Sequence, residues 1–154
     1  NMHYSDNYNY IIEDFEGSGT IIDSTLSSEI DFSEISEQGN NYAYARVDTP
    51  NITFECALDE FNLPQQGASV YLEMDYKCNS EFQIGVYSNY NQSVEKNDLL
   101  FVTPKEEWSK IYVNLTPVVS SSIGANSFRI YINQRRLTNN SFAEIYFDNI
   151  KIIY

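Results

Sequence analysis

Side chains that could bind a sugar recur at alternate positions of three apolar segments, residues 51–58, 81–89 and 127–134. A flat aromatic ring can lie against the apolar face of a pyranose, while amide, guanidinium and carboxylate groups reach its hydroxyls. We predict that Tyr87 and Tyr131 are the aromatic platforms. The polar groups on the same side are Glu55, Gln83, Arg129 and Asn133. The alternative is ordinary cross-strand packing on a solvated sheet face.

Catalytic chemistry has weaker support in the sequence. Pairs of carboxylates carry out glycoside hydrolysis, and Glu73 with Asp75 is one such pair, as is Glu106 with Glu107. The chain contains 22 acidic residues, so pairs of this kind arise by chance. The single histidine, His3, lies in a polar leader, which disfavours mechanisms that need a histidine base or several histidine metal ligands. We therefore expect a module that is not an enzyme.

The charge balance restricts the partners. The formal net charge is -13, and a polyanion of this strength is repelled by DNA, RNA and anionic lipid. The same charge favours a neutral or basic glycan over a uronate or sulfate polymer. No apolar run approaches the roughly 20 residues that a membrane-spanning helix requires, so we expect no transmembrane segment and no nucleic-acid partner.

Apolar and polar residues alternate along several segments, and a period of two predicts half-buried antiparallel strands. In residues 69–77, for example, the apolar positions are Val70, Leu72, Met74 and Tyr76. Turn-forming Asn, Ser, Gly and Pro separate these segments. Eight of them follow the leader, at residues 42–47, 51–58, 69–77, 81–89, 98–103, 108–115, 127–134 and 142–154.

Eight such strands predict an all-β fold, an antiparallel two-sheet β-sandwich of the jelly-roll type. In that topology the first, eighth, third and sixth segments form one sheet, and the second, seventh, fourth and fifth form the other. Residues 10–16 would add an edge strand to the first sheet. We predict a flexible leader over residues 1–9 and a single domain over residues 10–154.

The last segment changes phase part-way along its length. Its apolar residues lie on one face up to Phe147 and on a shifted set of positions from Ile150 onward. A strand cannot do this without an extra residue, so we predict a β-bulge at Asp148-Asn149. The bulge would turn the Asp148 carboxylate away from the ordinary inward and outward directions.

The two cysteines, Cys56 and Cys78, both occupy inward-facing positions. The residue of the third segment that lies opposite Cys56 should be near Leu72. Cys78 is then about 20 Å further along the strand, whereas a disulfide needs Cα atoms within about 7 Å. We predict that both cysteines remain unpaired and behave as small buried apolar groups.

Three short motifs resemble those of a known family. They are Ile12-Glu-Asp-Phe-Glu-Gly17 near the start, Glu107-Trp-Ser-Lys-Ile-Tyr-Val-Asn-Leu115, and Glu144-Ile-Tyr-Phe-Asp-Asn-Ile-Lys-Ile152 at the end. Their order resembles that of the galactose-binding-like jelly rolls, which include many bacterial carbohydrate-binding modules, and that of small surface lipoprotein domains of gut Bacteroidetes. The resemblance extends from about Ile11 to Tyr154, and the motifs mark the fold more specifically than the ligand.

The resemblance also implies a metal site, a packing role and a location. Many such modules hold a structural calcium between the first and last strands, and the matching positions here are Glu16 and Asp148. In the alternative, Asp148 only caps the bulge through backbone amides. Trp108 would pack as a corner residue of the core. The parent protein would be extracellular or at the cell surface, and lipid-anchored in its full-length precursor.

Three functions remain open from the sequence. The first is a non-catalytic extracellular module that binds a glycan weakly on one sheet face. The second is a structural or adhesion module that contacts a protein at the cell surface. The third is an enzyme that acts on polysaccharide.

Overall fold

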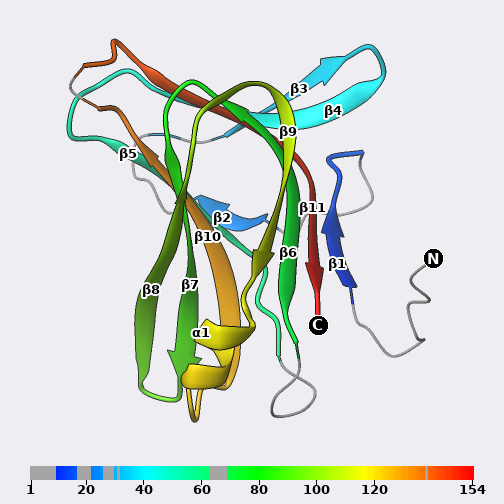
Figure 1. The fold of residues 1–154 in the computed structure, drawn as a ribbon, viewed down its shortest axis with the longest axis vertical. Coiled ribbons are helices and arrows are strands. Elements are labelled where there is room, and N and C mark those ends of the chain that lie inside the picture. Colours follow the sequence, from blue (N-terminus) through cyan, green and yellow to red (C-terminus); the bar gives the residue numbers. More distant parts are fainter. Residues whose placement is uncertain (1–9, 17–21, 26–29, 31, 63–68, 138) are drawn as a thin grey trace.

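The computed structural model describes residues 10–16, 22–25, 30, 32–62, 69–137 and 139–154. In this part of the chain, two antiparallel sheets face each other (Figure 1). The first sheet contains β1 (Tyr10–Glu13), β3 (Ser33–Glu37), β4 (Asn40–Val47), β6 (Tyr71–Cys78), β9 (Lys105–Asn114) and β11 (Ala143–Ile153). The second sheet contains β2 (Ile22–Thr25), β5 (Thr53–Leu58), β7 (Phe82–Tyr90), β8 (Ser93–Val102) and β10 (Ser127–Arg135).

The strand order confirms the predicted sandwich. The first sheet runs β3-β4-β11-β6-β9, with β1 paired to β11, and the second runs β2-β5-β10-β7-β8. All eight predicted segments therefore lie in their predicted sheets, and the segment that begins at Tyr10 joins the first sheet. The sequence pattern missed the short strands β2 and β3, and it missed helix α1 (Thr116–Ser121). This helix links β9 of one sheet to β10 of the other.

The predicted bulge in β11 is confirmed. The pairing of β11 with β6 shifts register between Asp148 and Lys151, and Asn149 adopts a φ of 48°, a left-handed conformation that Asn tolerates better than most residues. Before the bulge β11 pairs with β4, and after it with β1. Since β6 occupies the other edge of β11 throughout, the bulge marks the point where one neighbour replaces the other.

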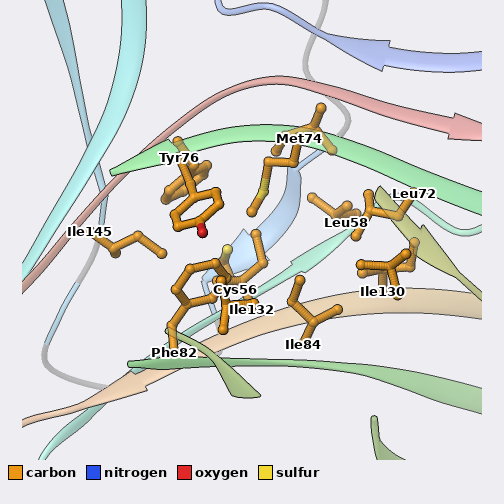
Figure 2. Close-up of a cluster of buried hydrophobic side chains, with 14 of the residues drawn as sticks. Cys56, Leu58, Leu72, Met74, Tyr76, Phe82, Ile84, Ile130, Ile132 and Ile145 are labelled. Atoms are coloured by element: carbon orange, nitrogen blue, oxygen red, sulfur yellow. The ribbon is translucent and has the colours of Figure 1, made fainter. Parts of the chain in front are cut away.

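The core lies between the two sheets and is filled by the alternating apolar side chains (Figure 2). Met74 and Tyr76 from β6 point toward Phe82 and Ile84 from β7, and the rings of Tyr76 and Phe82 meet edge to face at 5.4 Å. Each fully buried side chain of this size stabilises the fold by about 1.5–3 kcal/mol. No disulfide joins Cys56 to Cys78, as predicted, and both are buried. Burial raises the pKa of the Cys78 thiol.

Candidate functional site

The six side chains proposed to bind a ligand come together on the outer face of the second sheet. Register places five of them in cross-strand pairs on β5, β10 and β7, because Asn133 lies opposite both Glu55 and Gln83, and Arg129 lies opposite Tyr87. Tyr131, the sixth, lies between Arg129 and Asn133 on β10. Their neighbours along each strand, such as Ile130 and Ile132, fill the core. The inward and outward phases read from the sequence are therefore the observed ones for these three strands.

Glu55 is the centre of a hydrogen-bonded group on this face. Its carboxylate accepts from Tyr87 Oη at 2.9 Å and from Asn133 Nδ2 at 3.0 Å, and it pairs with Lys96 Nζ at 2.6 Å. The Glu55 side chain is 13% exposed. Desolvation opposes the charge on Lys96, but the contacts with Glu55 outweigh it and raise the lysine pKa. Glu55 thus fixes three neighbours in place. Because these contacts occupy its carboxylate oxygens, Glu55 is less able to bind a ligand itself.

Tyr131 is not the exposed platform that we predicted. Its side chain is fully buried, at 0% exposure, although it lies outside the core between the sheets. Lys96 Nζ lies 4.6 Å from its ring centroid, the Tyr87 ring lies 4.9 Å away, and its hydroxyl donates to Asp98. The alternation predicted the correct direction for Tyr131, but it could not predict that Lys96 and Tyr87 cover the ring.

Gly85 makes room for this packing. It lies directly opposite Tyr131, and a Cβ atom at this position would overlap the tyrosine ring. Without a side chain at Gly85, the ring lies flat across the strand and becomes the floor of the outer face. Burial, followed by the hydrogen bond to Asp98, raises the pKa of the Tyr131 hydroxyl well above its usual range.

Two hollows flank this floor. One, of about 360 Å³, is lined by Tyr87, Arg129, Ala57, Glu60, Asn89 and Val94. The other, of about 320 Å³, has Gln83, Asn133, Asp98, Phe101 and Arg135 in its lining. Four of the six predicted ligand-binding residues therefore line a hollow. A fifth, Glu55, holds two of these four, Tyr87 and Asn133, through hydrogen bonds.

Phe101 is an exposed aromatic side chain on this face that the sequence analysis missed. It is 58% exposed on β8 and lies opposite Gln83. The pairing of β7 with β8 shifts register between Ile84 and Gly85, and the irregularity brings Asp98 and Phe101 to the same face. Their spacing of three residues hides this from a pattern of period two. Residues 98–103 were predicted to form a strand of this sheet. Phe101 is the one aromatic residue of that segment, and this was the signal from which an exposed ring could have been predicted.

The two residues proposed as calcium ligands are engaged by amides in this structure. Asp148 accepts from the backbone N–H of Asn149 at 2.7 Å and from Asn40 Nδ2 at 3.0 Å. Glu16 accepts from the backbone N–H of Asn41 at 2.7 Å. Burial, and then the nearby charges of Asp75 and Glu16, raise the pKa of Asp148. A cation bound beside this carboxylate would lower its pKa again.

The two carboxylates meet only part of what calcium requires. Calcium takes six to eight oxygen ligands, and the described residues contain no group of three or more His, Cys, Asp or Glu side chains arranged around a metal position. Residues 17–19, which follow Glu16 and could supply carbonyl oxygens, lie outside the described residues. The amide cap on Asp148 is the alternative stated above, and calcium binding stays a prediction.

Trp108 is not the core residue that we predicted. It is 43% exposed and lies on the outer face of the first sheet. The strand begins at Lys105, earlier than expected, so Trp108 lies within β9 and not at a corner before it. Ile111 and Val113 pack toward the core, which leaves Trp108 on the opposite side.

Comparison with known proteins supports the fold and leaves the ligand open. The sequence matches no protein-family model and no curated protein. Among solved structures, the family 30 carbohydrate-binding module of a cellulosomal cellulase of Clostridium thermocellum superposes with a TM-score of 0.67 at 15% identity, over 92% of this chain and 96% of that one. This chain has the β-sandwich fold of carbohydrate-binding modules.

Two further carbohydrate-binding modules share this sandwich. The family 11 module of another Clostridium thermocellum cellulosomal cellulase gives a TM-score of 0.61 at 16% identity, over 94% of each chain. A family 29 module gives 0.61 at 13% identity, over 95% of this chain and 88% of that one. No helix among the described residues is both long enough and apolar enough to cross a membrane.

Replacing Tyr131 by Ala tests its role as the floor of the outer face. Removing a fully buried aromatic side chain costs about 3–5 kcal/mol, so we expect the melting temperature to fall by roughly 6–20 °C. Tyr112→Ala is the matched control, because Tyr112 is 72% exposed and its loss should cost within about 0.5 kcal/mol. Equal melting temperatures for the two variants, measured by calorimetry, would show that Tyr131 is not packed as described.

Calcium binding is tested by melting the protein in calcium and in chelator. At 100-fold excess over Kd, a bound ion adds about 2.7 kcal/mol, so the melting temperature should rise by several degrees. Asp148→Asn should lose this rise, and it should be no less stable than the native protein in chelator, because it removes a buried charge near Asp75 and Glu16.

Asp48→Asn is the control for charge alone. Asp48 is an exposed carboxylate paired with Arg46, and its replacement should keep the full response to calcium. An unchanged melting temperature of the native protein, together with no bound metal by elemental analysis, would remove the calcium site.

Proposed function

We propose that this domain is a non-catalytic module that binds a neutral or basic oligosaccharide weakly on the outer face of its second sheet. The carrying observation is the pair of hollows on that face, each bordered by an aromatic ring and by hydrogen-bonding side chains. Tyr87 is the platform of one hollow and Phe101 that of the other. Gln83, Arg129 and Asn133 supply the polar contacts, and Glu55 and Tyr131 support them from below.

The polar side chains of this face are pre-arranged. Glu55 holds Tyr87, Lys96 and Asn133 through its two carboxylate oxygens. Side chains fixed before binding lose less conformational freedom when a ligand arrives. A sugar would therefore meet a fixed ring and fixed donors, an arrangement that favours recognition of the position of hydroxyl groups over simple apolar adhesion.

The charges on this face favour a ligand without negative charge. Glu60 borders the first hollow, and Glu81 and Asp98 border the second. Hydrogen bonds from Ser127 and Asn89 lower the pKa of Glu60, so this carboxyl is ionised at neutral pH. Together with the net charge of -13, these carboxylates would repel uronate and sulfate groups.

The length of the face suits several sugar units. Arg129 borders one hollow and Arg135 the other, and they lie six positions apart along β10, which is about 20 Å. A linear oligosaccharide laid along β10 would contact both rings. The hollows are open to solvent, so we expect a Kd between tens of micromolar and about 1 mM. Many copies on a repeating polymer would compensate for this weakness through avidity.

The absence of catalysis is part of the proposal. Glu73 and Asp75, a carboxylate pair noted in the sequence, both contact Lys110, at 2.7 Å and 3.6 Å. A partly exposed ion network of this kind suits a structural role more than acid–base chemistry. We also propose that the parent protein is extracellular or at the cell surface and lipid-anchored in its precursor, where a glycan-binding module meets polymers.

Phe101→Ala and Tyr87→Ala test the binding face. Each should weaken the binding of a neutral hexasaccharide, chosen from cellohexaose, xylohexaose and mannohexaose, by at least about fivefold, or ~1 kcal/mol. Tyr87→Phe keeps the ring and loses only the hydrogen bond to Glu55, so it should retain most of the affinity. Titration calorimetry gives these constants, and melting curves check that each variant is folded.

Two outcomes would contradict the proposal. If the native domain binds no hexasaccharide and no matching polymer in affinity electrophoresis, the glycan function is wrong. The alternative function, an adhesion module that contacts protein, is then favoured. If sugars bind but neither substitution matters, the second sheet is not the binding face. Release of new reducing ends from polysaccharide would instead support an enzyme.

A further inference from the structure

We infer that the outer face of the first sheet carries a second saccharide-binding site, in a hollow beside Trp108. This inference rests on the proposed function for its class of ligand, but it uses a different surface and different residues. The hollow has a volume of about 370 Å³, within the usual range for ligand sites, and is lined by Trp108, Asn40, Asp75, Lys110, Asp148 and Asn149.

The Trp108 ring is held in position without being covered. Tyr42 meets it edge to face at 5.3 Å, and Tyr146 does so at 6.4 Å. Lys77 Nζ lies 5.8 Å from its ring centroid. With these three neighbours in place, the side chain still exposes 43% of its surface. A fixed and exposed indole offers a stacking surface at little cost in conformational freedom.

Hydrogen-bond donors and acceptors border the ring. Lys110 Nζ lies 2.7 Å from Glu73 and 3.6 Å from Asp75, and Asn149 Nδ2 donates to Asp75 at 2.8 Å. The bulge in β11 places Asn149 here, because bulges re-aim side chains. An ammonium group, an amide and a carboxylate next to an aromatic ring match the hydroxyls and the apolar face of a neutral pyranose.

The two sites cannot share one sugar unit or one short stretch of chain. Trp108 lies on the outer face of one sheet, and Tyr87 lies on the outer face of the other. Packed sheets are about 10 Å apart, and the core fills the space between them. A module with both sites would therefore hold two glycan strands at once, and this would strengthen attachment to a polymer network through avidity.

The chain contains a single tryptophan, so its emission reports on this hollow. We expect the neutral hexasaccharide that binds the native domain to change the tryptophan emission. The change should persist in the Tyr87→Ala/Phe101→Ala double variant, which lacks the first site. By calorimetry the native domain should bind about two hexasaccharides, and this double variant about one.

Variants of the hollow complete the test. Trp108→Ala should also reduce the stoichiometry to about one, while Tyr112→Ala, on the same strand and face but outside the hollow, should leave about two. Asn149→Gly suits the positive φ at this position and removes only the amide. It should lower the affinity measured by tryptophan emission several-fold and leave the melting temperature unchanged.

The possible failures are distinguishable. If the native domain binds sugar with a stoichiometry of one, loses it in Tyr87→Ala/Phe101→Ala and shows no change in emission, the second site is wrong and the proposed function stands. If Trp108→Ala abolishes all binding and the double variant changes nothing, the Trp108 hollow is the binding site and the second sheet is not. If no hexasaccharide binds, both proposals fail.

Discussion

Each long strand of this protein has to bury one of its two faces, and this constraint decides where chemistry can occur. The inner faces of both sheets are apolar and fill a common core. Aromatic and charged side chains of the strands that could contact a ligand consequently lie on the two outer faces. The sandwich thereby provides two broad surfaces on opposite sides, and its irregularities decide which side chains reach them.

On the second sheet, one small residue organises the surface. The missing side chain of Gly85 lets Tyr131 lie flat, and the buried ring then supports Lys96 and Tyr87, which meet at Glu55. The exposed parts of the face are the regions on either side of this group, where Arg129 and Phe101 border separate hollows. The buried tyrosine acts as a support, and the proposed binding surface is displaced toward the ends of the strands.

The sequence predicted the regular parts of this arrangement and missed those that depend on irregular pairing. The bulge at Asp148-Asn149 was predictable, because apolar residues of the same strand change phase on either side of it. The irregularity beside Gly85 leaves no such mark, and Phe101, which it brings to the outer face, was overlooked. Trp108 was misplaced because β9 begins earlier than expected, so that the alternation of Ile111 and Val113 extends back to it. Coverage of Tyr131 by Lys96 likewise depends on a neighbouring strand that begins earlier than its apolar pattern indicates.

The most direct test of the central claim is a map of backbone amide chemical shifts during titration with the neutral hexasaccharide that the domain binds. The proposed face predicts changes on β5, β7, β8 and β10 that centre on Tyr87, Arg129, Asn133 and Phe101, and that saturate with the calorimetric affinity. Changes confined to the loops at either end of the sandwich, with these four strands unaffected at saturation, would contradict the account.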